Sequence, residues 1–403
     1  MNIVDLQLDY SIFREPETIK YRLIDLFSGA GGMTIGFTDA RFGGGFKSIL
    51  AIDNNRSAIA TYKANLDSKN AVLADLEEWL AEKPEIPKAD VIVGGIPCQG
   101  FSRLNRKREG DRRRTLWQPF MQVVKASQAL VFVIENVPDI LRSDEFKQIT
   151  DCAASLGFNI VADVLNSANY GVPQTRKRAV IIGWQSNIRS PKFPPKPTHG
   201  NNWLTLRDAI GDLPEPEGTN IRPVDPPLDL HFGRNPTDKS IARYQAVPPG
   251  GNRFDLLKNA PELSPPCWVN PTYQGTDLFG RLWWDRPSVT IRTEFFKPEK
   301  GRYLHPEKHR PITHREAARL MGFPDDFRFM GSKTAIARQL GNAVPPPLAG
   351  AIAKTIRRML DCTGNRRSLI ANCHEPSQFK ESTPKVCRSD YLCGTGNFAA
   401  GYL

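Results

Sequence analysis

The feature that most constrains the fold of this chain is a repeated alternation of short apolar runs with helix-compatible segments. This alternation is typical of βαβ units, in which helices cover both faces of a mainly parallel sheet. We therefore expect an α/β fold, to which 162–165 and 178–183 add later strands. The apolar runs lie at 22–27, 48–53, 90–93 and 129–134, and the helix-compatible segments lie at 56–65 and 117–128.

The chain has 403 residues, a length that suggests more than one domain. Its proline content and its helical periodicity change along the sequence. Prolines crowd 191–249 and no sustained helical period appears there, which predicts a smaller, loop-rich domain. Helical patterns return at 313–321, where Thr313 is a suitable N-cap, and at 347–360. The expected division is 1–183 for the first part of the α/β domain, 184–285 for the loop-rich domain, 286–360 for a segment that completes the α/β domain, and 361–403 for an irregular tail.

Charge and cysteine content narrow the class of protein. The net charge of +11 and the pI near 9.3 favour a polyanionic partner such as nucleic acid. No apolar run reaches the roughly 20 residues of a spanning helix, and no secretion signal begins the chain, so we expect a cytoplasmic protein. Seven cysteines without paired zinc-type spacing, including four after Asp361, predict reduced thiols and no metal site.

A glycine-rich turn follows the first apolar run, at 28–32. Small residues there let backbone amides approach a ligand at the start of a helix. Asp53 ends the next apolar run, near the offset at which a carboxylate meets ribose hydroxyls, and Asp75 follows the one after that. Taken alone, each aspartate is better explained as an ordinary strand end or helix cap. The ordered series favours a ligand that contains a nucleoside.

Three further groups point to chemistry at the same sheet edge. Cys98 lies in a polar, glycine-flanked loop after a buried strand, which favours an exposed nucleophile over a small buried hydrophobe. Glu135 follows another strand and is either a proton donor in a shielded pocket or a surface cap. Arg176 and Arg178 share one face of a strand and are either fixed cations beside the thiol or a solvated basic strand end.

The order of these motifs resembles the cytosine-5 DNA methyltransferases, which use S-adenosylmethionine and have a Rossmann-like catalytic domain with a smaller target-recognition domain. The resemblance runs from Tyr21 to about Arg358. It is carried by Asp25-Leu-Phe-Ser-Gly-Ala-Gly-Gly32, Pro97-Cys98-Gln99 with Phe101-Ser102, Glu135-Asn136-Val137, Gln174-x-Arg176-x-Arg178, Arg286-Pro-Ser-Val-Thr-Ile291, Arg315-Glu-Ala-Ala-Arg-Leu-Met-Gly-Phe-Pro324 and Gly341-Asn-Ala-Val-Pro345.

The resemblance implies a role for each matching residue. Cys98 would add to C6 of cytosine, Glu135 would contact the N3 and N4 edge, and Arg176 with Arg178 would hold the base carbonyl. Cofactor contacts would come from Phe27, Ser28, Gly29, Gly31, Asp53, Asn54, Asp75, Leu76, Pro97, Leu116, Asn342 and Ala343. Further substrate contacts would come from Gln99, Ser102 and Gln174.

The family also implies double-stranded DNA as the partner, with the target cytosine flipped out of the helix. Recognition would lie in 184–285, in a monomeric bacterial enzyme near the nucleoid that acts alone or beside a restriction endonuclease for the same site. The basic residues after the thiol fit either a loop that closes over DNA or a solvated charged loop. These are Arg103, Arg106, Lys107, Arg108, Arg112, Arg113 and Arg114.

Three other functions compete with this interpretation. An RNA cytosine-5 methyltransferase would share the scaffold and the chemistry, and the roughly 100-residue recognition stretch favours DNA over it. A catalytically silent DNA-binding protein is disfavoured because Cys98, Glu135, Gln174 and Arg176 are all present. A nucleotide-dependent oxidoreductase would explain the glycine turn but not the thiol loop.

Overall fold

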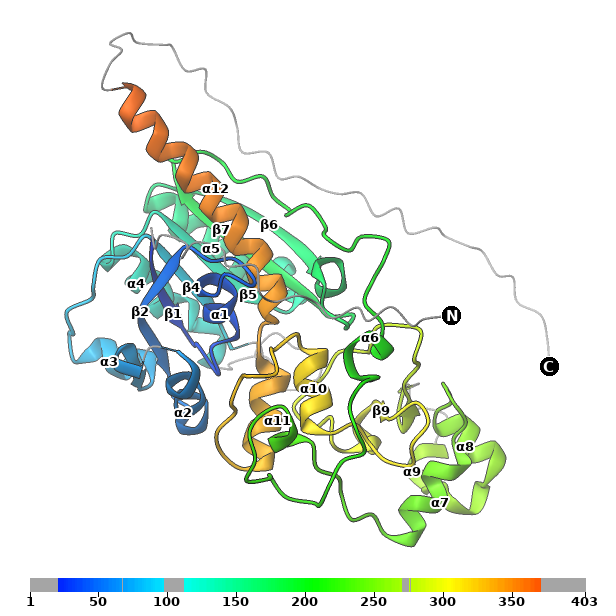
Figure 1. Ribbon diagram of the computed structural model, residues 1–403. Coiled ribbons are helices and arrows are strands. Elements are labelled where there is room, and N and C mark those ends of the chain that lie inside the picture. The colour runs from blue at the N-terminus through cyan, green and yellow to red at the C-terminus, as the bar shows by residue number, and fades with distance from the viewer. Residues whose placement is uncertain (1–20, 67, 98–111, 270–274, 276, 371–403) are drawn as a thin grey trace, which may run out of the picture.

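The computed structural model describes residues 21–66, 68–97, 112–269, 275 and 277–370. Its centre is a seven-stranded sheet in the order β3-β2-β1-β4-β5-β7-β6, as Figure 1 shows. The first five strands pair in parallel, while β7 runs antiparallel to both β5 and β6. The expected mainly parallel α/β fold is therefore confirmed. The strands are β1 (Tyr21–Leu26), β2 (Phe46–Asp53), β3 (Ala71–Leu73), β4 (Val91–Gly95), β5 (Val131–Asn136), β6 (Phe158–Asn166) and β7 (Lys177–Gln185).

Alternating side chains fill both faces of this sheet. In β4, Val91 and Val93 enter one hydrophobic cluster and Ile92 enters the other, and all three are fully buried. This two-sided burial explains why the strands read as continuous apolar runs. One cluster packs under α3 (Leu76–Ala81), α4 (Trp117–Ala126) and α5 (Asp144–Ser155), and the other under α1 (Gly32–Thr38) and α12 (Pro346–Ile370). Helix α2 (Arg56–Asn65) lies beside β2 and β3.

Helix α12 ties the end of the described chain to its beginning. It packs on α1 where a Cβ at Gly36 would overlap Ala349, so only glycine permits this approach. The hydroxyl of Tyr21 donates to Asp361 Oδ1 at 2.8 Å. The expectation of an irregular tail from residue 361 is wrong for its first ten residues, because α12 continues to Ile370. The other expected strands and helices also exist, although β6 and β7 are longer than the apolar runs that predicted them.

A second set of elements lies beside the sheet, on the side of α10 and α11 in Figure 1. Its hydrophobic cluster joins Leu206 and Phe232 to Ile291, Leu320 and Ile336, so the core runs across position 285. This cluster does not mark a boundary at 285, and the domain boundary there stays a prediction. The elements are α6 (Leu206–Ile210), α7 (Asp238–Ala246), α8 (Arg253–Asn259), α9 (Pro266–Val269), β8 (Gly280–Arg281), β9 (Arg302–Leu304), α10 (His314–Leu320) and α11 (Lys333–Asn342).

Local chemistry explains why this region is irregular and yet ordered. The buried guanidinium of Arg281 donates to the carbonyl oxygens of Tyr244, Val247, His305 and Lys308, at 2.6 to 3.0 Å. These bonds satisfy backbone groups that a helix or sheet would otherwise pair. Helix α10, by contrast, begins as predicted at the N-cap Thr313, which forms a capping box with Glu316. Within the described ranges, no helix is long and apolar enough to cross a membrane.

Candidate active site

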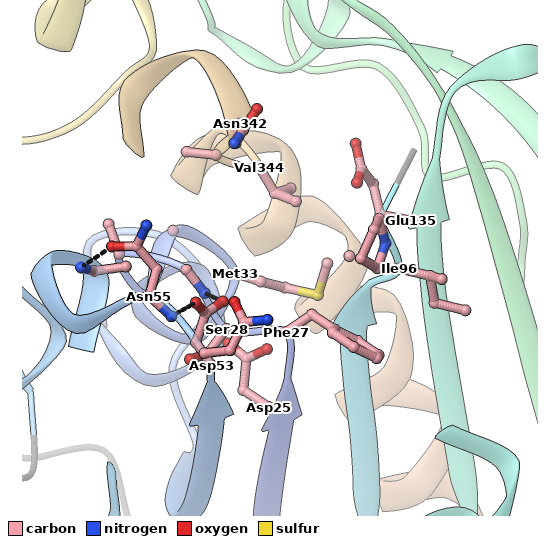
Figure 2. A pocket seen from close by; sticks show the side chains of 18 of the residues that line it. Asp25, Phe27, Ser28, Met33, Asp53, Asn55, Ile96, Glu135, Asn342 and Val344 are labelled. Carbon is pink, nitrogen blue, oxygen red and sulfur yellow. Dashed lines mark hydrogen bonds between the residues drawn. The ribbon is translucent and has the colours of Figure 1, made fainter. Parts of the chain in front are cut away.

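A cavity of ≈ 470 Å³ opens at the carboxyl ends of the parallel strands. It lies where β1 and β4 meet, which is the point in the strand order from which the chain winds in opposite directions. Figure 2 shows Asp53 and Glu135 on opposite sides of this cavity, with Asn342 above them. Its walls come from the segments after β1, β2, β3 and β4, from β5, from the arginines at the start of β7, and from 341–344 at the end of α11.

The glycine turn forms one wall. Gly29 and Gly31 have φ angles of 54° and 90°, and Phe27 has 57°, so the chain passes through the left-handed region three times in five residues. The amide of Gly29 donates to Asp53 Oδ2 at 2.9 Å, and the amide of Asn55 donates to Oδ1 at 2.8 Å. Burial raises the pKa of Asp53, and these two amides oppose the rise. The predicted pairing of the turn with Asp53 is thus a direct hydrogen bond.

Asp75 both caps a helix and lines the cavity. It is the N-cap of α3, where its Oδ1 accepts from the Glu77 amide at 3.0 Å, and it also lines the cavity. The cap interpretation and the binding interpretation of this aspartate are therefore compatible. One carboxylate oxygen holds the helix end, which fixes the side chain beside the cavity.

Glu135 and Arg178 form the charged centre of the opposite wall. Arg178 Nε lies 2.9 Å from Glu135 Oε1, and the two side chains are 14% and 9% exposed. Burial raises the pKa of Glu135, although Arg178 and Arg176 both act to lower it. A carboxyl group in this environment is suited to proton donation.

Arg176 also lines the cavity, but its guanidinium is bonded to the backbone. It donates to the carbonyl oxygens of Ile291, Gly341 and Ala343 at 2.9 to 3.2 Å, and the residue is only 2% exposed. The two arginines of the motif therefore have different surroundings. Arg178 faces the carboxylate, whereas Arg176 joins the two chain segments that close the cavity.

The structure brings most of the predicted site residues to this cavity. Those lining it are Phe27, Ser28, Gly29, Asp53, Asn54, Asp75, Leu76, Pro97, Leu116, Glu135, Arg176, Arg178, Asn342 and Ala343. Cys98, Gln99 and Ser102 lie outside the described residues, and Pro97 is the last described position before the thiol.

Two predicted residues lie outside the cavity lining. Gly31 precedes α1, where a Cβ would come within 2.5 Å of Leu66, so the glycine allows α1 and α2 to approach. Gln174 is fully buried and holds backbone instead: its Nε2 donates to the Leu320 carbonyl and its Oε1 accepts from the Ile291 amide, both at 2.9 Å. These two bonds link Gln174 to the end of α10 and to Ile291.

The basic run after the thiol is only partly described. Arg114 donates from both Nε and Nη2 to the Glu145 carboxylate, at 2.5 and 2.8 Å. This bidentate pair anchors the short 3₁₀ turn at Arg112–Thr115 to α5, so Arg114 is ion-paired and does not fit the solvated charged loop. Arg113 lines the cavity.

Three residues that shape the site were given no role from the sequence, although Asn136 and Asp25 lie in the quoted motifs. Asn136 is buried and its Nδ2 donates to the Ile96 carbonyl at 3.1 Å, which steadies the segment that leads to the thiol. Asp25 lines the cavity although it is only 1% exposed, and its signal was a lone charge inside an apolar strand. Arg338, an exposed residue of α11, also lines the cavity and had no sequence signal. In the part of the chain that the structure describes, no three His, Cys, Asp or Glu side chains are grouped to hold a metal ion.

Comparison with known proteins supplies the family. The C-5 cytosine-specific DNA methylase family matches residues 21–358. The type II methyltransferase M1.HphI of Haemophilus parahaemolyticus is 35% identical over 347 residues, 83% of this chain and 86% of the relative. The type II methyltransferase M.Eco47II of Escherichia coli is 32% identical over 361 residues, 86% and 81% of the two chains.

Solved structures agree with this assignment. A crystal structure assigned as a prophage-encoded DNA modification methyltransferase (E. coli) has a TM-score of 0.65 and 25% identity, covering 85% of this chain and all of the other. The S. pombe Dnmt2 methyltransferase, at 18% identity and a TM-score of 0.59 over 85% of this chain and all of its own, shares the fold. The chain thus belongs to the C-5 cytosine-specific DNA methylases and is a DNA (cytosine-5)-methyltransferase, whose family uses S-adenosylmethionine as the methyl donor.

Proposed function

We propose that this protein is a type II modification methyltransferase that methylates one cytosine within a specific duplex DNA sequence. The observation that carries the proposal is the single cavity in which the Asp53–glycine turn faces the Glu135–Arg178 pair. One side suits a nucleoside cofactor and the other suits a base, and Pro97, next to the nucleophile Cys98, lies between them. Relatives that carry the type II name span most of this chain.

The cavity residues fit the cofactor of the family. A volume of ≈ 470 Å³ falls within the range of small-molecule sites, about 300–1,000 Å³. Nothing lies within 4 Å of the position of a Cβ at Gly29, so a ligand can approach this backbone closely. We assign the ribose hydroxyls to Asp53 and the adenine to Asp75 and Leu76. When bound, S-adenosylmethionine supplies an electrophilic methyl group beside the cytosine.

Further cofactor contacts come from the rest of the lining. Phe27, Ser28 and the Gly29 backbone would surround the methionine part, and Asn342 with Ala343 would close it from the end of α11. The remaining predicted contacts are Asn54, Pro97 and Leu116.

The chain's own residues make cytosine C5 reactive. The Cys98 thiolate forms a bond to C6, and the Glu135 carboxyl group delivers its proton to N3, so electron density accumulates at C5. After C5 has taken the methyl group, its proton is lost to solvent, the C5–C6 double bond re-forms and the C6–S bond breaks to release the thiolate. The N3 proton returns to the Glu135 carboxylate. Burial raises the pKa of Glu135 and so favours the protonated form from which this proton is delivered.

We assign different roles to Arg176 and Arg178 because their surroundings differ. Arg178, paired with Glu135, would contact the base carbonyl and balance charge near the thiolate. Arg176 acts as a positioning residue, because its guanidinium donates to three backbone carbonyls that close the cavity. Gln174 also bonds to Ile291 and links it to Leu320.

Sequence recognition would lie in 184–285, in a protein that acts as a monomer on flipped-out cytosine. Supporting features are a separate hydrophobic cluster around Tyr244, Leu256 and Phe279, and Phe254 of α8, which is 50% exposed. A restriction endonuclease for the same site would be the cognate partner. Bisulfite mapping of DNA from cells that express the protein would identify the methylated sequence.

Cys98→Ser tests the covalent step. We expect loss of radiolabelled methyl incorporation with cofactor affinity unchanged, because the thiol forms the bond to cytosine and the cavity residues bind the cofactor. Calorimetric titration with S-adenosylhomocysteine is the control for an intact cofactor site. Substantial turnover by the serine variant would remove Cys98 from the mechanism.

A further inference from the structure

Two exposed arginines lie beside the segment that closes the cavity. Arg338 of α11 lines the cavity and is exposed, so it lies at the cavity mouth. Arg292 is exposed too, and it stands outside the lining. Neither guanidinium forms a hydrogen bond or an ion pair with any residue in the described part of the chain. This separates them from Arg176 and Arg178, whose guanidinium groups are both bonded within the protein.

The backbone holds both arginines at the same rim. A Cβ at Gly341 would come within 2.5 Å of the carbonyl carbon of Arg292, so the two chain segments touch beside the cavity. Arg176 donates to the carbonyl oxygens of Ile291 and Gly341, at 3.1 and 2.9 Å, which joins the segments. Arg338 precedes Gly341 by about one turn of α11. The positions of the two cations are therefore fixed relative to the cavity.

Three carboxylates of the cavity lining have other partners. Asp25 Oδ2 accepts from Thr34 Oγ1 at 2.6 Å, and Asp53 accepts from two backbone amides. Glu135 is paired with Arg178. None of these three carboxylates pairs with an arginine of the rim. Two exposed cations without an acidic partner in the described ranges fit an anion that comes from outside the protein.

The position of the two arginines indicates which anion this is. Because Arg292 does not line the cavity, a ligand held inside the cavity does not reach both cations. A flipped nucleotide rotates out of the duplex about its own backbone, so its base enters the pocket while its phosphates stay at the mouth. A guanidinium group stays charged and binds phosphate through two parallel hydrogen bonds. The chemistry and the position therefore both fit the DNA backbone.

We propose that Arg338 and Arg292 bind the two backbone phosphates that flank the flipped cytosine, one phosphate each. They act as positioning residues, because they hold the sugar–phosphate chain across the mouth while the base lies beside Glu135. Phosphates carry no sequence information, so these contacts serve every site that the protein methylates. The inference rests on the proposed function, because it takes a cytosine of duplex DNA as the substrate.

The test is a double-mutant cycle between each arginine and each phosphate. The DNA is a duplex that contains the methylation site found by bisulfite mapping, and a single uncharged methylphosphonate replaces the phosphate on the 5′ or the 3′ side of the target cytosine. Arg338→Ala and Arg292→Ala should each weaken binding of the unmodified duplex about tenfold and reduce the slope of log K against log salt by about one. Each variant should lose no further affinity at one of the two neutral linkages, and this linkage should differ between the variants.

Three controls separate this role from a general loss of charge or of structure. Arg338→Lys keeps the charge, so it should keep the salt dependence of the wild type. Arg358→Ala removes an exposed arginine of α12 that does not line the cavity, and it should leave DNA affinity unchanged. Calorimetric titration with S-adenosylhomocysteine should give the wild-type affinity for both rim variants.

Two results would overturn the inference alone. The first is a pair of alanine variants that lose as much affinity at both neutral linkages as the wild type does. The second is an Arg338→Ala protein with weakened S-adenosylhomocysteine binding and unchanged DNA binding, which would assign this arginine to the carboxylate of the cofactor. A wild type that binds and methylates no duplex rejects the proposed function, and this inference with it.

Discussion

Replacing Asp25 with asparagine should stabilise the protein at neutral and alkaline pH. The folded protein holds the Asp25 proton more tightly than the unfolded chain does, because burial raises the pKa from 3.8 to about 7. The free energy of unfolding therefore decreases as pH rises through this window and levels off above it. At about 1.4 kcal/mol for each pH unit, the full window corresponds to about 4 kcal/mol. Asparagine avoids this penalty and keeps an oxygen that accepts from Thr34.

Urea unfolding of both proteins between pH 4 and pH 8.5 measures the effect. The advantage of Asp25→Asn should be near zero at pH 4, grow with pH, and reach up to about 4 kcal/mol at pH 8. Asp285→Asn is the matched control, since its side chain is 79% exposed and its replacement should change stability by less than about 0.5 kcal/mol. An advantage that is equal at pH 4.5 and pH 8, or an Asp25→Asn protein that is less stable at pH 8, would refute the reasoning.

Three further substitutions test other parts of the site. Glu135→Gln should lower methyl transfer about 10²–10⁴-fold while S-adenosylhomocysteine affinity stays within about twofold, and equal turnover would exclude Glu135 as the proton donor. Gly31→Ala should cost about 1–3 kcal/mol in urea unfolding, because φ is 90° and the new Cβ would come within 2.5 Å of Leu66; an unchanged midpoint would contradict this. Arg114→Ala should lower the thermal midpoint by removing the bidentate pair with Glu145, and an exposed-arginine control, Arg358→Ala, should leave it unchanged.

The sheet and most of the cavity were predictable because their signals are local. Continuous apolar runs identify strands buried on both faces, and parallel strands bring their carboxyl ends to one edge. The turn at Gly29, Asp53 and Glu135 each follow such a run, so their meeting in one cavity follows from the alternation. The helix at 56–65 and the N-cap Thr313 were likewise visible from local pattern and capping chemistry.

Long-range pairing accounts for the errors. Nothing near Gln174 in the sequence shows that its amide bonds to Leu320 and Ile291, which lie more than a hundred residues away. The ion pair between Arg114 and Glu145 is hidden for the same reason, since a run of arginines reads as solvated when its acidic partner is 31 residues distant. The helix after Asp361 was missed because its sequence is polar.

The motif Gln174-x-Arg176-x-Arg178 connects the catalytic sheet to the elements beyond it. Gln174 bonds to the end of α10 and to Ile291, and Arg176 bonds to Ile291 and to the end of α11. Both side chains are buried within a few residues of Arg178, which carries the ion pair to Glu135. A displacement of the 286–342 segment would therefore act on two buried side chains that lie just before Arg178, the arginine for which we propose a contact with the base. Because the hydrophobic cluster that contains Leu206 and Phe232 continues into this segment, we expect DNA docking on the proposed recognition region to act on the same hydrogen bonds.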